Sequence, residues 1–221
     1  MKERKYFIVS AASLIVFTLW TVLIMNVDVQ AVGSRNSKVG LATFNTWFHQ
    51  LTGVHMTLYT ITDWLGLVPI AVCLCFGCLG IYQLIKRRRL LKVDPDILLL
   101  GAYYILVIVG YLIFEMIPIN FRPVLIDGFL EASYPSSTTL LVLSVMPTLV
   151  FQIKRRRDNK NSRTFIIILT VVFSVFMVVG RLVSGVHWAT DIIGSVLLSF
   201  GLFYLYKGAV RAVDMRSHHG V

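Results

Sequence analysis

Six long apolar stretches divide this chain, and they constrain its fold more than any other feature. A bilayer core is about 30 Å thick, so a helix that spans it needs about 20 mostly apolar residues. The stretches that reach or approach this length cover about residues 6–26, 65–85, 97–118, 137–153, 164–184 and 190–210. Because backbone groups in lipid must be satisfied within each segment, the predicted fold is all-α, a six-transmembrane-helix bundle in a single membrane domain over residues 1–221.

The first stretch has a basic start, which is also typical of a signal peptide. It holds Lys2, Arg4 and Lys5 before its apolar run, and no small-x-small cleavage site follows that run. A run of about 20 apolar residues is longer than the apolar part of a signal peptide. We therefore expect a retained span.

The basic residues orient the bundle. If both termini are cytoplasmic, 17 of the 21 lysine and arginine residues lie at the inner face, and only Arg35, Lys38, Arg122 and Arg181 lie outside. This bias follows the positive-inside rule, so it predicts a multi-pass protein of the plasma (inner) membrane. It also explains the net charge of +10 without a nucleic-acid partner.

Residues 27–64 form one long external segment between the first two spans. Within it, apolar residues recur at helical spacing: Phe44, Trp47, Phe48, Leu51, Val54 and Leu58. This pattern predicts an external amphipathic helix that lies in the interface with its aromatic rings at headgroup depth.

The residues with chemical potential gather in two further outer loops. They comprise two arginines, a serine–threonine cluster, a histidine and an aspartate: Arg122, Arg181, Ser136, Ser137, Thr138, Thr139, His187 and Asp191. The span assignment places all of them at the outer ends of spans three to six. Ionisable residues in such positions are functional candidates.

Each residue type suits phosphate chemistry. Arg122 and Arg181 offer planar forks that bind phosphate oxygens in bidentate fashion. A helix that opens after Pro135 directs free N–H groups towards an anion. If a helix begins at His187, then Asp191 shares its face, accepts Nδ1–H and leaves Nε2 free to attack. Together these features predict phosphoryl transfer through a phosphohistidine.

Each feature also has a structural interpretation when taken alone. Residues 136–139 are typical of a helix N-cap. Arg122 is compatible with a loop end at the headgroups, and His187 with Asp191 is compatible with a structural pair at a helix start. Their coincidence on one membrane face favours the functional interpretation.

The arrangement resembles the type 2 phosphatidic acid phosphatase superfamily, which is related to vanadium haloperoxidases. Its third signature is matched by Arg181, His187 and Asp191, with five residues between the first two and three between the last two. Arg122-Pro123 matches the end of the first signature, and residues 134–136 match the start of the second. The similarity covers about residues 65–210, and the signatures lie within 115–191.

The resemblance implies a role for each matched residue. His187 would be the nucleophile and Asp191 its orienting partner. The phosphate would be held by Arg122, Arg181, Ser136, Ser137 and Thr138.

Four positions depart from the family pattern. Glu115 replaces the lysine of the first signature, and Gly180 replaces the serine that opens the third. In the second signature, Ser137 replaces a glycine and Thr138 replaces the general-acid histidine. A positioned acid contributes about 10²–10⁴-fold, so its loss disfavours an alkoxide leaving group. A lipid monophosphate, with a second pKa of about 6, leaves more easily. Glu115 is interpreted as a modulator, either a partner of Arg122 or Arg181 or a replacement acid.

We therefore expect a metal-independent lipid phosphatase without a cofactor, acting at the outer face on a lipid diphosphate or monophosphate. A polyprenyl diphosphate is favoured over phosphatidic acid. Two alternatives stay open: a degenerate protein that binds or transports lipid phosphates, and a phosphotransferase that passes the phosphoryl group to an acceptor other than water.

Overall fold

The structure, a computed structural model, describes residues 2–219 and the side chains of residues 3–215. The side chains of Lys2 and Arg216, counted above among the inner basic residues, lie outside the described part, as do Met1, Gly220 and Val221. The described elements are α1 (Lys2–Asn26), a short 3₁₀ helix (Ser34–Asn36), α2 (Ala42–Thr52), α3 (Met56–Leu65), α4 (Leu67–Arg87), a second 3₁₀ helix (Leu90–Lys92), α5 (Pro95–Met116), α6 (Ser137–Arg156), α7 (Lys160–Val183) and α8 (Ala189–His219).

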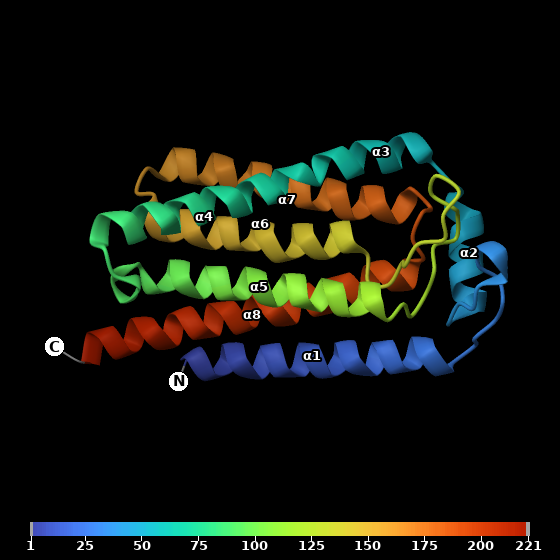
Figure 1. Ribbon diagram of the computed structural model, residues 1–221, viewed down its shortest axis with the longest axis horizontal. Helices are drawn as coiled ribbons and strands as arrows, with labels where there is room; N and C mark the ends of the chain where they lie inside the picture. Colours follow the sequence, from blue (N-terminus) through green and yellow to red (C-terminus); the bar gives the residue numbers. More distant parts are fainter. Residues whose placement is uncertain (1, 220–221) are drawn as a thin grey trace.

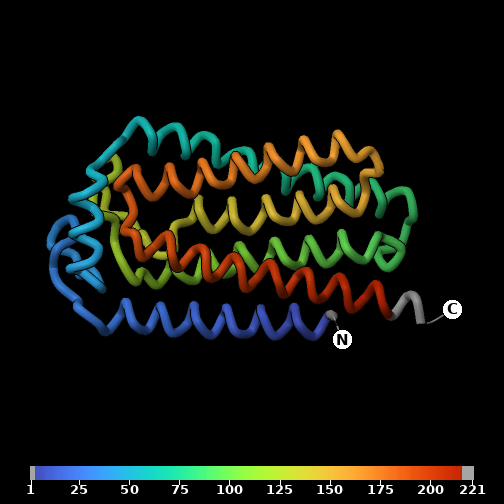
Figure 2. Tube along the Cα trace, turned by 180° about the vertical axis from the view of Figure 1, so that it is seen from behind, coloured from blue at the N-terminus to red at the C-terminus, as the bar shows by residue number. Residues whose placement is uncertain are grey.

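Six helical stretches are long and apolar enough to cross a membrane: Glu3–Asn26, Met56–Arg87, Pro95–Met116, Ser137–Arg156, Lys160–Val183 and Ala189–Met215. The predicted all-α fold with six spans is confirmed, and the chain is a multi-pass integral membrane protein. In Figure 1 the long helices run side by side along the long axis of the molecule. Both chain ends lie towards one end of the bundle, which we call the terminal end, and α2 crosses the opposite end (Figures 1 and 2).

Helices α1 and α8 pack closely because small residues of α8 face α1. A Cβ atom on Gly201 would lie 2.8 Å from Leu14, and one on Gly208 would lie 3.2 Å from Phe7. The hydroxyl of Ser10 also donates to the carbonyl of Gly201 at 2.8 Å. Small residues and interhelical hydrogen bonds are the usual means of joining helices in lipid, so these contacts fix the first span against the last.

Hydrogen bonds from one buried and one partly buried tyrosine join α5 to α6. Tyr103 donates to the carbonyl of Ser144 at 2.9 Å, and the hydroxyls of Tyr104 and Thr148 lie 2.8 Å apart. Each buried polar group thereby obtains the partner that burial requires. The central helices are thus held in one register along the bundle.

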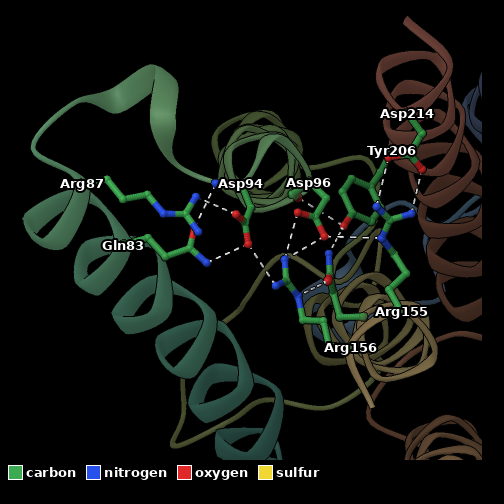
Figure 3. Close-up of polar contacts among 9 residues, drawn as sticks. Gln83, Arg87, Asp94, Asp96, Arg155, Arg156, Tyr206 and Asp214 are labelled. Atoms are coloured by element: carbon green, nitrogen blue, oxygen red, sulfur yellow. Dashed lines mark hydrogen bonds and ion pairs between the residues drawn. The ribbon is translucent and has the colours of Figure 1, made fainter. Parts of the chain in front are cut away.

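A network of alternating charges ties the helices together at the terminal end (Figure 3). Arg156 of α6 bridges Asp94 at 3.1 Å and Asp96 at 2.8 Å. The network continues through ion pairs of Arg87 with Asp94 and of Arg155 with Asp214, each at 2.7 Å. It links α4, α5, α6 and α8 where the predicted inner loops begin and end.

The external segment differs from the prediction of one amphipathic helix. Helix α2 ends at Thr52, and Gly53 breaks it with a φ of +69°, a left-handed conformation that glycine adopts freely. Val54 therefore lies outside α2, and Leu58 belongs to α3, which leads directly into α4. The second span accordingly begins at Met56 rather than near residue 65.

Helix α2 nevertheless carries an exposed apolar face. Phe44, Trp47 and Leu51 are 39%, 58% and 70% exposed. On its other face Asn45 is buried and donates to Thr190 Oγ1 at 2.9 Å. Helix α2 is therefore fastened to the start of α8, next to the residues described below.

Candidate active site

The end of the bundle opposite the terminal end holds the predicted site residues. Arg181 lies in the last turn of α7, and His187 lies in the turn that follows. Asp191 lies in the first turn of α8, and the loop before α6 supplies Arg122. The fold thereby brings together two arginines, the histidine and the start of α6.

His187 is 4% exposed, and its two ring nitrogens have different surroundings. Nδ1 lies 3.2 Å from the carbonyl oxygen of Ser133 and 3.0 Å from its hydroxyl oxygen. Because a carbonyl oxygen only accepts, this contact places the proton on Nδ1. Nε2 is buried and has no hydrogen-bond partner among the described residues, so its lone pair is available.

Asp191 contacts His187 through a third residue rather than directly. The hydroxyl of Ser133 donates to Asp191 Oδ2 at 2.5 Å and accepts from His187 Nδ1. The sequence spacing predicted a shared helical face, but α8 begins at Ala189, after the histidine. Asp191 instead accepts from the backbone N–H of Trp188 at 2.9 Å, as a capping residue in the first turn does.

The two arginines are buried and only partly paired. Arg122 pairs with Glu131 at 3.1 Å. Arg181 pairs with Asp63 at 2.7 Å and also donates to the hydroxyl of Thr138. In both guanidinium groups, Nε and Nη1 are buried without a hydrogen-bond partner among the described residues.

The ring of Tyr59 lies against both guanidinium groups. Its centroid is 4.7 Å from Cζ of Arg181 and 5.6 Å from Cζ of Arg122. These are cation–π distances. A single side chain of α3 therefore holds the two like charges near one another.

The start of α6 lies beside the guanidinium groups of Arg122 and Arg181. Ser137 lines a polar cavity of ≈ 230 Å³ together with Arg122, Glu115 and Glu131, while Thr138 contacts Arg181. The first N–H groups of a helix have no intrahelical partner. Ser136 is more deeply buried, and its hydroxyl donates to Thr139 Oγ1 at 3.1 Å, inside the helix start.

Glu115 was interpreted as a partner of Arg122 or Arg181 or as a replacement acid, and in the structure both arginines have other carboxylate partners. Glu131 pairs with Arg122 and Asp63 with Arg181. Glu115, at the exposed end of α5, lines the cavity beside Arg122. Within the described part of the chain, no group of three or more His, Cys, Asp or Glu side chains is arranged to hold a metal ion.

Sequence reasoning did not identify four residues that complete the arrangement: Tyr59, Asp63, Glu131 and Ser133. Asp63 lies just before the predicted second span, and only the longer span Met56–Arg87 makes it an acidic residue within an apolar helix, where such residues are functional candidates by default. Tyr59 lies one helical turn before it on α3. Ser133 carried no comparable signal.

The electrostatics of the site keep His187 neutral. Burial lowers the pKa of its imidazole well below the ordinary value of 6.5, and the charges of Arg122 and Arg181 lower it further. A neutral imidazole with Nδ1 protonated presents its lone pair at Nε2. The site therefore combines a nitrogen with a free lone pair and two fixed positive charges.

Five buried nitrogen atoms in this site lack partners among the described residues: His187 Nε2, and Nε and Nη1 of Arg122 and of Arg181. Leaving a buried charged donor unsatisfied costs about 1–3 kcal/mol or more. The charge of these groups and the nearby helix start suit an anion with several oxygens, such as a phosphate group.

Comparison with known proteins identifies a superfamily and a fold relative. Residues 105–213 match the PAP2 superfamily, and the chain belongs to that superfamily. It is similar in fold to a transmembrane PAP2-type phosphatidylglycerolphosphate phosphatase from Bacillus subtilis, with a TM-score of 0.58 and 17% sequence identity over 90% of this chain and 94% of that one. No curated protein sequence matches the chain.

Proposed function

We propose that this protein is a lipid phosphate phosphatase that forms a phosphohistidine at His187. The observation that carries the proposal is the set of five buried, unpartnered nitrogen atoms on His187, Arg122 and Arg181. A phosphate group would satisfy the four guanidinium atoms and place its phosphorus before Nε2. The PAP2 superfamily match over residues 105–213 supports the same activity.

The proposed reaction has two displacements. His187 Nε2 attacks phosphorus, so an N–P bond forms while the bond to the leaving oxygen breaks, and the lipid departs with that electron pair. Nδ1–H remains hydrogen-bonded to Ser133, which stabilises the ring as it gains positive charge. Water then attacks the phosphohistidine, and inorganic phosphate leaves with Nε2 restored.

The arginines stabilise the transition state. Negative charge grows on the equatorial and leaving oxygens during phosphoryl transfer, and fixed cations stabilise that charge without reorganising. Asp63 and Tyr59 hold Arg181, and Glu131 holds Arg122. These contacts leave Nε and Nη1 of each arginine for the phosphate.

A diphosphate lipid is the substrate class that the site favours. Thr138, which replaces the histidine of the family pattern, engages Arg181 through its hydroxyl, and a threonine hydroxyl is a poor acid near neutral pH. A lipid monophosphate departs without a proton because its second pKa is about 6, whereas an alkoxide needs one. A polyprenyl diphosphate therefore suits the site better than phosphatidic acid.

Phosphate release from purified protein tests the proposal. The assay offers polyprenyl diphosphate, phosphatidylglycerolphosphate and phosphatidic acid, and we expect release from at least the first. His187→Ala should abolish release and the acid-labile phosphoenzyme. His55→Ala replaces an exposed histidine whose Nε2 donates to the carbonyl of Thr52 at 2.9 Å, so it is the matched control and should retain activity.

Two other outcomes have distinct signatures. Saturable binding of lipid phosphates without release of inorganic phosphate would identify a binding or transport protein. A phosphoenzyme that forms but turns over only when a second lipid or alcohol is added would identify a phosphotransferase. Wild-type rates in His187→Ala would contradict the phosphohistidine step under any of these functions.

We also propose that the site faces the outside and that both termini are cytoplasmic. The basic connections that begin at Arg88 and Arg157 lie at the terminal end of the bundle (Figure 1). Single cysteines at Gly128 and Asp158 test this in a background where Cys73, Cys75 and Cys78 are replaced. An impermeant reagent applied outside should label position 128 and not 158, and the reverse result would place the site in the cytoplasm.

A further inference from the structure

A long groove opens between α7 and α8, with α6 as its floor. It has a volume of ≈ 770 Å³, and its walls are largely apolar: Pro147 and Val150 of α6, Val171 and Val175 of α7, and Val196 and Phe203 of α8. These residues recur at helical spacing, so each helix contributes one continuous stripe. Val171 and Val175 are 51% and 57% exposed, so the groove is open to the surroundings of the bundle.

Basic side chains line the groove at the terminal end. Lys154 of α6 and Lys207 and Arg211 of α8 lie there, together with Arg155. Arg155 is engaged by Asp214 and Asp96 in the charge network (Figure 3). The groove is thus apolar along most of its length and cationic at one end.

Three of these cations are not neutralised within the described part of the chain. Lys154, Lys207 and Arg211 form no ion pair with a described carboxylate. Lys207 is held instead by aromatic rings, with Nζ 4.7 Å from the centroid of Tyr6 and 5.5 Å from that of Tyr204. Such contacts fix the position of an ammonium group and leave its charge available to an anion.

The dimensions of the groove match one leaflet of a bilayer. Val196 and Arg211 both line it, and the 15 residues between these positions correspond to about 22 Å along the helix. Half of a bilayer, counted with its headgroup region, is about 20–22 Å thick. A lipid with its headgroup at the basic end would therefore lay its acyl chain along the valines.

We infer that this groove binds an anionic phospholipid of the leaflet at the terminal end. Its phosphate would contact Lys154, Lys207 and Arg211, and one acyl chain would fill the space between α7 and α8. Charge complementarity selects this occupant, because cationic side chains at headgroup depth attract anionic lipids. The site is separate from the phosphate site at His187, since Arg211 lies about 33 Å along α8 from the first residue of that helix.

Native mass spectrometry of the purified full chain tests the inference without requiring catalysis. The protein is titrated with phosphatidylglycerol and with phosphatidylcholine of identical chains. We expect tighter retention of phosphatidylglycerol. The triple variant Lys154→Gln/Lys207→Gln/Arg211→Gln should weaken its binding on the order of 10- to 100-fold and bring the two lipids close together.

A matched variant separates the groove from general surface charge. Arg88→Gln/Arg89→Gln/Lys160→Gln removes three exposed cations near the same end that do not line the groove, and it should retain phosphatidylglycerol binding. Equal losses in the two triple variants would overturn the inference. The groove variant Lys154→Gln/Lys207→Gln/Arg211→Gln could fail to fold. In that case Lys154→Gln alone should still reduce the preference for the anionic lipid, since this side chain is exposed.

A second variant tests the apolar part of the groove. Val175→Trp fills it, and we expect lower retention of phosphatidylglycerol with little change in the melting temperature of the lipid-free protein. If Val175→Trp instead raises KM only for long-chain substrates and leaves phosphatidylglycerol binding unchanged, the groove holds the substrate chain and the inference is wrong.

Discussion

The hydroxyl of Ser133 lies 3.0 Å from Nδ1 of His187, in the place where the sequence predicted a carboxylate. The same hydroxyl donates to Asp191 at 2.5 Å. The carboxylate of Asp191 is therefore linked to the imidazole through a serine. Asp191 sets the direction of these hydrogen bonds, since it only accepts while ionised.

Ser133→Ala tests this relay. The substitution removes the hydroxyl and leaves the backbone carbonyl that also accepts from Nδ1. We expect kcat to fall on the order of 10-fold, the worth of a buried hydrogen bond. Ser199→Ala is the matched control, because that hydroxyl bonds only within its own helix, to Val196.

The double variant Ser133→Ala/Asp191→Asn tests whether Asp191 affects His187 through Ser133 or independently of it. If Asp191 acts through Ser133, the double variant should be about as slow as the slower single variant, since contacting residues are not additive. Losses in kcat that multiply would show that Asp191 reaches His187 by another route.

Tyr59 provides a second test, because its ring lies against both arginines. Tyr59→Leu removes the ring, and we expect KM to rise about 10-fold as the guanidinium groups lose their shared support. Tyr59→Phe keeps the ring and should resemble wild type. Equal defects in the two variants would assign the effect to the hydroxyl rather than to the ring face.

Asp63→Asn tests the ion pair with Arg181 in the same way. The variant keeps a hydrogen-bond acceptor and removes the charge, so Arg181 should be less firmly positioned. We expect a larger effect on kcat/KM than on melting temperature, because the amide oxygen still accepts from buried Arg181 and the Asp63 side chain is 57% exposed, so solvent screens the charge that is lost. A loss confined to melting temperature would indicate a structural role.

Much of the fold and part of the site could be predicted, because they depend on residues that are close together in the sequence. Six spans follow from apolar length alone, because lipid imposes that length on any helix. Arg181, His187 and Asp191 lie within 11 residues, so their proximity follows from the chain itself. The break at Gly53 was not predicted, since apolar residues keep their helical spacing on both sides of it.

The missed residues come from distant parts of the chain. Asp63 meets Arg181 across 118 positions, and Ser133 meets His187 across 54. Such contacts depend on how α3 and the loop before α6 dock against α7 and α8. No local pattern around Ser133 marks it, since serine is common in loops.

The pH dependence of activity follows from the lowered pKa of His187. Burial and then the two arginines disfavour the imidazolium, so the nucleophile stays neutral as the pH falls through 6.5. We expect protonation of the enzyme to lower kcat/KM only at pH values below 6.5. The substrate ionisation is measured separately by phosphorus NMR, and a loss of kcat/KM from protonation of the enzyme at or above pH 6.5 would contradict a buried neutral His187.

Stability should respond to pH for the same reason. Between the lowered folded pKa and the unfolded value of 6.5, the unfolded chain binds more protons at this position, so the free energy of unfolding rises with pH across that window. The melting temperature of wild type should therefore fall on acidification below about pH 6.5. His187→Gln lacks the titrating group and should show a smaller fall.

The last prediction concerns Thr138, whose hydroxyl engages Arg181 at the position where the family pattern has a general acid. Ser137→Gly/Thr138→His restores the family residues at both positions. If leaving-group protonation is what the site lacks, the rate on phosphatidic acid should rise about 10-fold or more, while a diphosphate lipid, whose leaving group needs no proton, gains little. The measurement is the ratio of kcat/KM for the two substrates.

Thr138→Ala is the control, since it removes the contact with Arg181 without adding an acid and should slow both substrates alike. If wild type already hydrolyses phosphatidic acid as fast as diphosphates, an acid is present elsewhere, and Glu115, which lines the cavity beside Arg122, becomes the residue to substitute.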